Sequence, residues 1–542
     1  MTPGSVINPI EGPVFSIVLQ AHFPFIPDLK NPDPREQTAF FESLSCTWLP
    51  FFAMIESLER DHVPFHLGLS LSPFFCRLLS EKSWIRAFID YLDRQTDFGL
   101  AEIERHKADA AMEALAKRYR NEAVAKKELL QKLLLEYKSL PGVFSALQER
   151  GRIELLVTAA TRAFLPFYVE YPEAIQAQFE TAIADHNQTF GAFPLGFWFP
   201  ELGWDQQCDP WLRAYNIGYT IVESHALVFG HPCAKKGSFY PVRTPRGTFI
   251  LGRDFYAAQT IQNFSRDHRY RSRTLDAGYE LPAEAVRAFL GPNGTRRPTG
   301  YVYQCCTDAP GTPPYDADAA KSLAAAQAAA FLDSGEARLA QASRFMDGPP
   351  ICLAAFPADL LGQSWYEGMT FLEQLFREAA RRTGQSHPGA LNIMNPGEYL
   401  YKQDPLGFQI VTPQWSSWGV KGSAETWLDA ANDRIYRHIM RSLERMTELA
   451  ERFPNAAGLK ERALNQAARE MLIAMSSDWA RMLKGQENRD YARLQVESAL
   501  RNFTTIYEAL ASRGLRALWL TNLEHSHNIF PQINYRIFRR KI

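Results

Sequence analysis

The chain has 542 residues, more than one compact core usually organises, so its length predicts a large domain with at least one appended unit. Its 59 basic and 60 acidic residues give a formal net charge of −1, which argues against the basic field of proteins that bind nucleic acid or an anionic membrane surface. Aromatic residues make up 13% of the chain, with 36 Phe, 21 Tyr and 11 Trp. We therefore expect a neutral ligand, no nucleic acid and no membrane, and carbohydrate binding is one use for so many aromatic rings. The oligomeric state is left open.

The start of the chain lacks the basic and apolar segments of a secretion signal, and no stretch approaches 18 uninterrupted apolar residues. Seven cysteines are scattered without a CxxC pair, which argues against both a disulfide framework and a zinc knuckle. The sequence therefore predicts a cytoplasmic protein with reduced thiols, no bound metal and no cofactor.

Short apolar runs rich in β-branched and aromatic residues recur along the first two thirds of the chain. Each run is bounded by turns or helical patterns and is too apolar for an exposed antiparallel strand, which favours a parallel α/β barrel. In such barrels the functional residues lie at the carboxyl ends of the strands. The runs are 14–20, 64–70, 153–158, 218–222, 248–252, 301–305 and 351–356.

Helical patterns occupy the remaining length. A charged stretch at about 100–150 has the pattern of a helical insertion, and a second helix is expected at about 317–346. From about residue 397 strand runs disappear, and helices are expected at 425–453, 459–482 and 489–512. We therefore expect a barrel domain over 1–396, with its insertion, and a helical C-terminal domain over 397–542.

A single carboxylate, Glu201, lies inside the aromatic run Gly-Phe-Trp-Phe-Pro-Glu-Leu-Gly-Trp at 196–204. Aromatic faces stack on sugar rings, and one fixed carboxylate can attack an anomeric carbon, so the run indicates a carbohydrate site. The alternative is a buried strand end whose glutamate pairs with an arginine.

Several segments, taken in chain order, resemble glycoside hydrolase family 57, in its branching-enzyme and α-amylase branch. The resemblance runs from near residue 14 to the C-terminus. The segments are Gln-Ala-His-Phe-Pro at 20–24, Thr-Arg-Ala-Phe-Leu-Pro at 161–166, the run at 196–204, Ser-His-Ala at 224–226, 359–368, Ser-Ser-Trp-Gly at 416–419, 425–428, 432–438, Ser-Ser-Asp-Trp at 476–479 and 530–536.

This resemblance implies a (β/α)7-type barrel with a helical C-terminal domain that acts on an α-glucan polysaccharide or maltooligosaccharide. The implied chemistry is a retaining double displacement that either makes α-1,6 branches or hydrolyses the glucan. Glu201 matches the family nucleophile.

The general acid is where this chain departs from the family pattern, which has an aspartate two residues before a glutamate. The chain has Pro-Ala-Asp at 357–359, so the resemblance puts Pro357 at the acid position and Asp359 at the glutamate position. Two residues along a strand return a side chain to the same face, about 7 Å further on. We therefore name Asp359 as a displaced acid, which requires a local rearrangement of the backbone. Three family histidines are also replaced, by Gln20, Arg162 and Gln363.

Arg162 near Glu201 would either keep that carboxylate ionised or block it in a salt bridge, and the sequence leaves both possibilities open. For glucan binding the resemblance implies stacking by tryptophans and polar contacts by histidines and charged groups, although such residues also serve in cores. The predicted binding residues are His22, Arg162, Trp198, Trp204, His225, Trp365, Trp415, Trp418 and Asp478.

Two classes of function therefore stay open. The first is a branching enzyme or amylase that uses Glu201 and Asp359. The second is a glucan-binding pseudoenzyme that keeps the fold without turnover. A polysaccharide deacetylase-like barrel would require a metal-binding aspartate with a pair of nearby histidines, a set that we do not find in the sequence.

Overall fold

A computed structural model describes residues 10–27, 34–291, 294–306, 314–385, 387, 389–485, 488–512 and 514–540. Seven parallel strands pair side by side in the order β1-β2-β3-β4-β5-β7-β8, and β8 pairs again with β1, which closes a barrel. This closure confirms the predicted (β/α)7-type barrel. The strands are β1 (Val14–Ala21), β2 (Leu67–Leu71), β3 (Ile153–Thr158), β4 (Gly196–Trp198), β5 (Tyr219–Glu223), β7 (Phe249–Arg253) and β8 (Ile351–Pro357).

Every residue of β1, β2 and β5 is buried, because helices cover the outside of the barrel while side chains fill its inside. Val18, Leu156, Trp198, Ile221 and Leu353 belong to one hydrophobic cluster that draws on six of the strands. Two short strands lie outside the ring: β6 (Val242–Arg243) runs antiparallel to β7, and β9 (Asn392–Ile393) runs parallel to β1.

Backbone pairing around the barrel is sparsest between β7 and β8. Among the described residues these two strands pair at Arg253 and Leu353 alone, whereas β1 and β8 share a register that runs from Val14 to Gln20. The Arg253 side chain supplements the join, because its Nε donates to the carbonyl oxygen of Ala355 at 2.5 Å.

The run at 301–305 was predicted to be a strand, and this prediction is wrong. Its residues form only isolated bridges to Arg271, Asp276 and Pro314. Tyr301 donates to the carbonyl of Gln95, and Tyr119 donates to the carbonyl of Val302. The apolar run is therefore buried against helices and not in the barrel.

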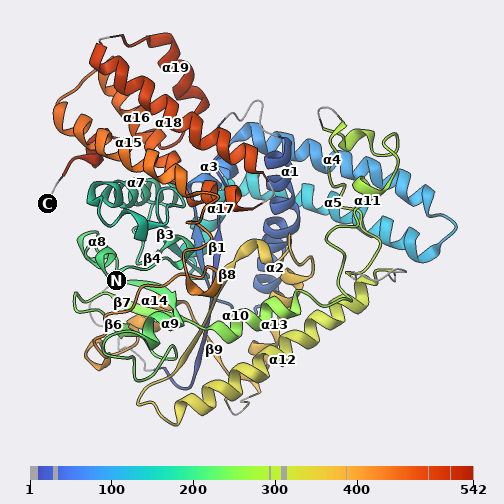
Figure 1. Cartoon of the computed structure of the whole chain (residues 1–542). Coiled ribbons are helices and arrows are strands. Elements are labelled where there is room, and N and C mark those ends of the chain that lie inside the picture. The colour runs from blue at the N-terminus through green and yellow to red at the C-terminus, as the bar shows by residue number, and fades with distance from the viewer. Residues whose placement is uncertain are drawn as a thin grey trace.

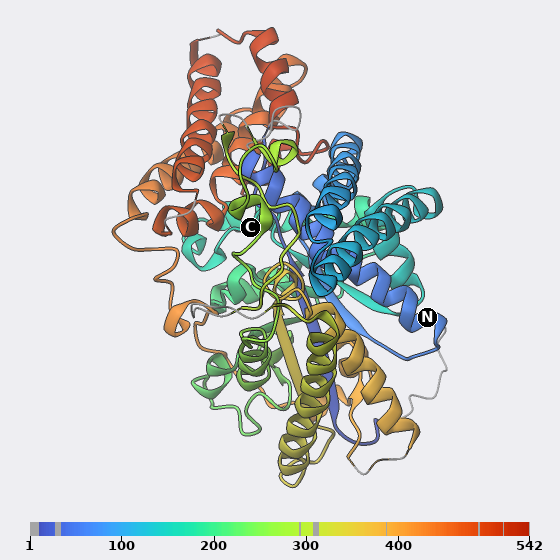
Figure 2. The same cartoon turned by 90° about the vertical axis from the view of Figure 1, so that its right-hand side faces the viewer.

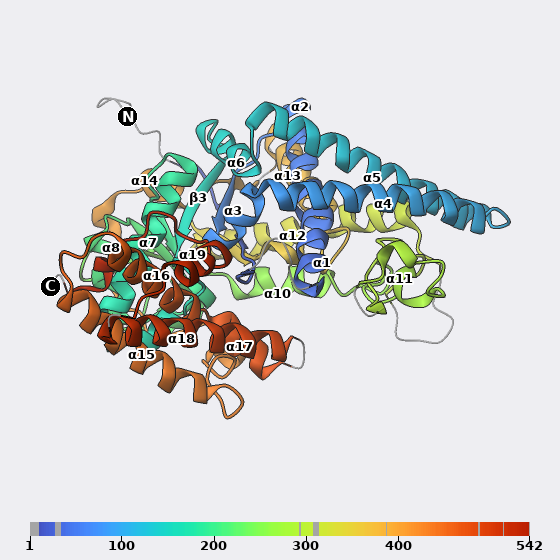
Figure 3. The same cartoon turned by 90° about the horizontal axis from the view of Figure 1, so that it is seen from above.

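A pair of long helices forms an arm on the side of the barrel away from the C-terminal helices (Figures 1 and 3). These helices are α4 (Lys82–Arg105) and α5 (Ala110–Tyr137), followed by α6 (Leu140–Glu149). Side chains of Asp109 and Ser139 accept from the first turns of α5 and α6 and so fix where each helix begins. The charged stretch predicted at about 100–150 falls on these elements, although α4 begins earlier.

The last third of the described chain is helical, and Figure 2 shows these helices projecting together from one end of the molecule. They pack with α7 (Pro172–Phe190) around one hydrophobic cluster that includes Leu443, Leu464, Met471 and Phe503. The domain boundary at residue 397 stays a prediction. The helices are α15 (Asp433–Arg452), α16 (Leu459–Ala474), α17 (Ser477–Lys484), α18 (Arg489–Ser512) and α19 (Ala517–Ser526).

The remaining helices cover the barrel. One continuous stretch, Arg35–Arg60, is long and apolar enough to cross a membrane by composition, but 67% of its most apolar window is buried inside the molecule. Phe40, Leu44 and Trp48 of this stretch pack in the main hydrophobic cluster, which accounts for its apolar character. The covering helices are α1 (Pro34–Glu42), the π-helix η1 (Ser43–Trp48), α2 (Leu49–Arg60), α3 (Pro73–Ser80), α7 (Pro172–Phe190), α8 (Asp209–Ala214), α9 (Ser224–Val228), α10 (Phe255–Phe264), α12 (Ala317–Ser343), α13 (Gly368–Gly384) and α14 (Pro396–Tyr401). The exception is α11 (Ala277–Glu280), which lies beside the arm of α4 and α5 (Figures 1 and 3).

Candidate active site

Glu201 lies just beyond the carboxyl end of β4, in a sharp turn. Glu201 and Leu202 have φ angles of 61° and 48°, in the left-handed region that non-glycine residues seldom adopt. The turn is braced by an antiparallel segment, since Trp204 and Ser416 exchange backbone hydrogen bonds and the Trp418 N–H donates to the carbonyl of Glu201. The backbone thus holds the carboxylate in one place, and such strain is concentrated at functional sites.

The Glu201 carboxylate is 2% exposed and makes four contacts with three side chains. Arg162 Nε lies 2.7 Å from Oε1, and Nη2 donates to Oε2 at 3.2 Å. The Ser477 hydroxyl donates to Oε1 at 3.1 Å, and the Trp418 indole N–H donates to Oε2 at 2.7 Å. Three of these contacts are hydrogen bonds, because the Arg162 Nε–H has no hydrogen-bond partner among the described residues, so one of the about four lone-pair positions of an ionised carboxylate is left open.

Arg162 also lies beside a second buried carboxylate, Asp478 in the first turn of α17. Its Nη1 lies 4.0 Å from Asp478 Oδ1, while Asp478 Oδ2 is 2.6 Å from His22 Nε2 and accepts from Ser476 at 2.8 Å. The backbone supports this arrangement, since the N–H of Ser477 donates to the carbonyl of Arg162. The barrel and the start of α17 together place His22, Asp478, Arg162 and Glu201 in successive contact.

Protonation in this chain follows from burial and from the neighbouring charges. Burial lowers the pKa of His22, although Asp478 opposes the effect, so the imidazole is neutral near pH 7. Burial opposes ionisation of Asp478, but the hydrogen bond from His22 and the charges of Arg162 and Arg481 hold the pKa of that carboxyl below its usual range. Burial likewise disfavours the charged guanidinium, yet Glu201 and Asp478 raise the pKa of Arg162. Asp478 is therefore a carboxylate and Arg162 a cation.

Asp359 lies two residues beyond Pro357, the last residue of β8, in the short 3-10 helix η7 (Ala358–Leu360). The strand-face spacing argued from the sequence therefore does not apply, because the backbone has already left the strand. Its Oδ1 accepts from Ser43 at 2.9 Å. Burial raises the pKa of Asp359 to about 6, against the opposing effects of Ser43 and Arg162. This group can therefore carry a proton at mildly acidic pH.

A second ion pair lies at the ends of the neighbouring strands and was not predicted from the sequence. Arg253, the last residue of β7, donates to Glu223 at the end of β5 at 2.6 Å. Its guanidinium lies 5.8 Å from the ring of Trp418. A charged residue directly after each apolar run was the signal that could have found this pair.

The predicted tryptophans fall into two groups. Trp198, Trp204 and Trp365 are at most 2% exposed: Trp198 lies in the barrel cluster, the Trp204 indole donates to the carbonyl of Pro413, and Trp365 packs on Tyr270. Trp415 and Trp418 are half-buried. Among the five, Trp418 is the one whose side chain has a described hydrogen bond to Glu201, so one predicted platform lies at that carboxylate and three indoles lie in the interior.

His225 is half-buried, and its ring lies against Gly422, in the turn that follows Trp418. Gln363 is exposed and lines a polar cavity of about 420 Å³ together with Tyr91, Tyr119 and Tyr366. Ser45 also lines this cavity and belongs to η1, the element whose Ser43 binds Asp359. The cavity therefore adjoins the segment that carries the candidate acid.

Within the described ranges, no group of three or more His, Cys, Asp or Glu side chains has the placement to hold a metal ion. The prediction that the protein uses no metal and no cofactor stays a prediction.

Comparison with known proteins identifies the family to which the chain belongs. The model of glycosyl hydrolase family 57 matches residues 16–284, which include Glu201 and Arg162, and the model of the 1,4-alpha-glucan branching enzyme C-terminal region matches 438–538, which include Asp478. The chain belongs to glycoside hydrolase family 57. The resemblance inferred from the sequence is confirmed.

Other family 57 proteins are similar over almost the whole chain. The 1,4-alpha-glucan branching enzyme TK1436 of Thermococcus kodakarensis is 24% identical over 511 residues, which cover 90% of this chain and 72% of that protein. The structure of the α-amylase AmyC from Thermotoga maritima matches with a TM-score of 0.90 at 28% identity, over 98% of this chain and 100% of AmyC. The branching enzyme of Pyrococcus horikoshii shares the fold, with a TM-score of 0.84 at 21% identity over 98% of this chain and 97% of that one.

Proposed function

We propose that this protein acts on α-1,4-glucans by a retaining double displacement, as a 1,4-α-glucan branching enzyme. Glycogen-like polysaccharides and maltooligosaccharides are the proposed partners. The similarity to two branching enzymes and an α-amylase supports the substrate class. We place the protein in the cytoplasm, because its seven cysteines are all free thiols, as is usual in a reducing compartment.

The observation that carries the proposal is the position of Glu201, buried at the end of a barrel strand and bound by Arg162, Ser477 and Trp418. In the first step Glu201 attacks the anomeric carbon, and the bond to the glycosidic oxygen breaks. With three hydrogen bonds to its two oxygens, the carboxylate keeps one lone-pair position, and loosening one of these hydrogen bonds makes it a better nucleophile. The Ser477 hydroxyl is an uncharged donor, so its hydrogen bond costs less to break than the ion pair with Arg162.

Asp359 is the proposed acid. It gives its proton to the departing glycosidic oxygen in the first step and takes a proton from the incoming hydroxyl in the second. When that hydroxyl is the 6-hydroxyl of another glucan chain, the product is an α-1,6 branch. When it is water, the product is a new reducing end.

The second candidate is a glucan-binding protein without turnover. It is favoured by the three hydrogen bonds that hold the Glu201 carboxylate and by Pro357, which cannot donate a proton, at the acid position that the family resemblance implies. The two candidates predict different outcomes of the same assay.

The test is incubation of the pure protein with amylose, followed by iodine absorbance, reducing ends and α-1,6 linkages. We expect iodine absorbance to fall and α-1,6 linkages to appear with few new reducing ends. Reducing ends without branches would assign hydrolysis in place of branching. Binding of amylose with no change in any of the three readouts would assign the second candidate.

The role of Asp359 as the acid can be tested through the pH dependence of kcat/KM. Since its pKa is about 6, the protonated fraction is large below pH 6 and falls by about tenfold per unit well above it. We expect kcat/KM on maltoheptaose to decline with that slope as the pH rises above 6, and Asp359→Asn to be at least about 100-fold slower without this decline.

An aryl maltooligoside with a 4-nitrophenol leaving group provides the control, because this group departs without a proton. Asp359→Asn should slow its cleavage much less than cleavage of maltoheptaose. A decline above pH 6 that persists in Asp359→Asn would assign the acid to another residue.

A further inference from the structure

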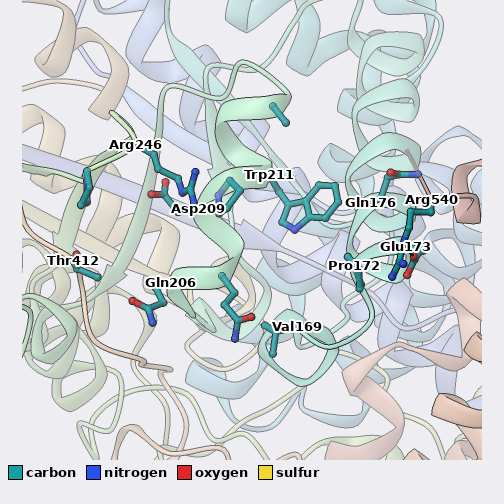
Figure 4. A pocket seen from close by; sticks show the side chains of 14 residues that line it. Val169, Pro172, Glu173, Gln176, Gln206, Asp209, Trp211, Arg246, Thr412 and Arg540 are labelled. Atoms are coloured by element: carbon teal, nitrogen blue, oxygen red, sulfur yellow. Dashed lines mark hydrogen bonds and ion pairs between the residues drawn. The ribbon is translucent and has the colours of Figure 1, made fainter. Parts of the chain in front are cut away.

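A second cavity, of about 570 Å³, lies on the outer side of the barrel between the start of α7 and α8 (Figure 4). Its volume is within the range of about 300–1,000 Å³ that is usual for small-ligand pockets. None of the residues that line it is among those that contact Glu201, Asp478 or Asp359. It is therefore a separate place from the candidate active site.

Trp211 is the central feature of this cavity. Its ring is half-buried and stacks on Tyr215, with centroids 6.4 Å apart and planes 14° apart, and Tyr215 stacks in turn on Phe179. This stack fixes the orientation of the indole. Figure 4 shows the ring in the middle of the cavity, with Gln206 and Arg246 on one side and Glu173 and Arg540 on the other. A fixed indole at the wall of an open cavity is a platform for a flat, weakly polar face.

The charges in the lining cancel. It contains two acidic residues, Glu173 and Asp209, and two basic residues, Arg246 and Arg540. Arg540 donates to Glu173 at 2.8 Å, and Asp209 accepts from Thr248 at 2.7 Å. With no net field and both carboxylates partnered, the cavity favours an uncharged ligand.

Neutral hydrogen-bonding groups complete the lining. Gln206 and Gln207 are exposed, and their side-chain amides make no hydrogen bond within the described residues. The exposed guanidinium of Arg246 is likewise without a partner there. Amides that both donate and accept suit a ligand whose edge carries many hydroxyl groups, and a glucosyl ring combines such an edge with an apolar face.

We propose that this cavity is a second glucan-binding site, in which glucosyl units stack on Trp211 and their hydroxyl groups bind Gln206, Gln207 and Arg246. The inference rests on the proposed function, since it takes the same α-glucan as ligand. The site holds one part of a long polymer while another part enters the site of Glu201. It therefore matters for polymers and not for short oligosaccharides.

The test uses the whole protein and two substrates. Binding is measured as retardation in native gels that contain glycogen, and turnover is measured on maltoheptaose. We expect Trp211→Ala to weaken glycogen binding by about tenfold and Arg246→Ala by about threefold, with maltoheptaose kcat/KM unchanged for both. Trp519→Ala removes a half-buried indole of α19 that lies outside the cavity, and it should behave as wild type in both assays.

Unaltered glycogen binding by a folded Trp211→Ala protein would overturn the inference. If that variant does not fold, Arg246→Ala decides, because the Arg246 side chain makes no contact whose loss would unfold the protein; wild-type binding then overturns the inference. A wild-type protein that glycogen does not retard also overturns it, whatever the turnover. If wild type shows no turnover but Trp211→Ala still loses retardation by glycogen, the result supports the second site and counts only against the proposed catalysis.

Discussion

Replacing Glu201 by glutamine is expected to lower kcat on amylose by about 10⁴-fold or more, which corresponds to roughly 5.5 kcal/mol of lost transition-state stabilisation. Glutamine has nearly the same size and shape, but its amide cannot form the glycosyl ester on which double displacement depends. Ser477 donates to Oε1 and Trp418 to Oε2, so the single amide oxygen keeps one of these two hydrogen bonds. The backbone hydrogen bond from Trp418 to the carbonyl of residue 201 is unaffected and should hold the shape of the turn at 201–202. The measurement is iodine absorbance together with product linkage, at equal concentrations of folded protein.

Glu223→Gln is the matched control. It is the same substitution at another buried carboxylate that ends a barrel strand and pairs with an arginine, here Arg253 at 2.6 Å. We expect a much smaller loss of kcat than for Glu201→Gln. Equal losses in the two variants would mean that the assay reports damage to this end of the barrel, and residual Glu201→Gln activity within tenfold of wild type would rule out Glu201 as the nucleophile.

Replacing Arg162 by methionine is expected to reduce the free energy of unfolding by about 3–5 kcal/mol at pH 7. The guanidinium is the cation shared by Glu201 and Asp478, and its loss leaves Glu201 without an ion-pair partner and Asp478 with only the more exposed Arg481, 3.7 Å away, among the described residues. Methionine retains the length of the side chain, so the change measures charge more than volume. Chemical denaturation with a two-state fit gives the free energy, and an unfolding free energy within 1 kcal/mol of wild type would contradict the expectation.

The destabilisation caused by Arg162→Met should depend on pH. Asp478 has a lowered pKa in the folded protein, so it stabilises the fold above the pKa of the unfolded carboxyl and loses that contribution as the pH falls. Because Arg162 helps to lower this pKa, the difference between wild type and variant should persist at pH 4 and shrink only below it, as the pH falls toward the lowered pKa of Asp478. Arg441→Met breaks an exposed ion pair with Glu444 and should change stability by no more than about 0.5 kcal/mol at either pH.

Apolar runs in the sequence predicted six of the seven barrel strands and missed β4, which has three residues, and β3 begins and ends at the predicted residues, Ile153 and Thr158. The run at 301–305 has the same composition, yet it is buried against α4 and α5. Composition could not separate the two cases, because an apolar segment is equally well buried by a helical arm and by a barrel.

The candidate site was predicted in part for a similar reason. Glu201 and Arg162 follow neighbouring strands, so the barrel brings them together by its order alone. The contact of Glu201 with Ser477 spans 276 residues and depends on how α17 docks, which no local pattern specifies. Trp198 was expected at the substrate, but its place on β4 turns the ring into the barrel interior. The alternation of a strand predicts two faces and not which face the ligand meets.

Trp418 contacts both Glu201 and Arg253, the residue that joins two strands of the barrel. Its indole N–H holds Glu201, and its ring covers the guanidinium of Arg253, which joins β7 to β8 where backbone pairing is sparse. A sugar that displaces this ring would remove one of the two hydrogen bonds to Glu201 Oε2, the other coming from Arg162, and would also uncover the Arg253 side chain that joins the two strands. Displacement of this one ring would then loosen the join between β7 and β8 and expose the Glu201 carboxylate at the same time.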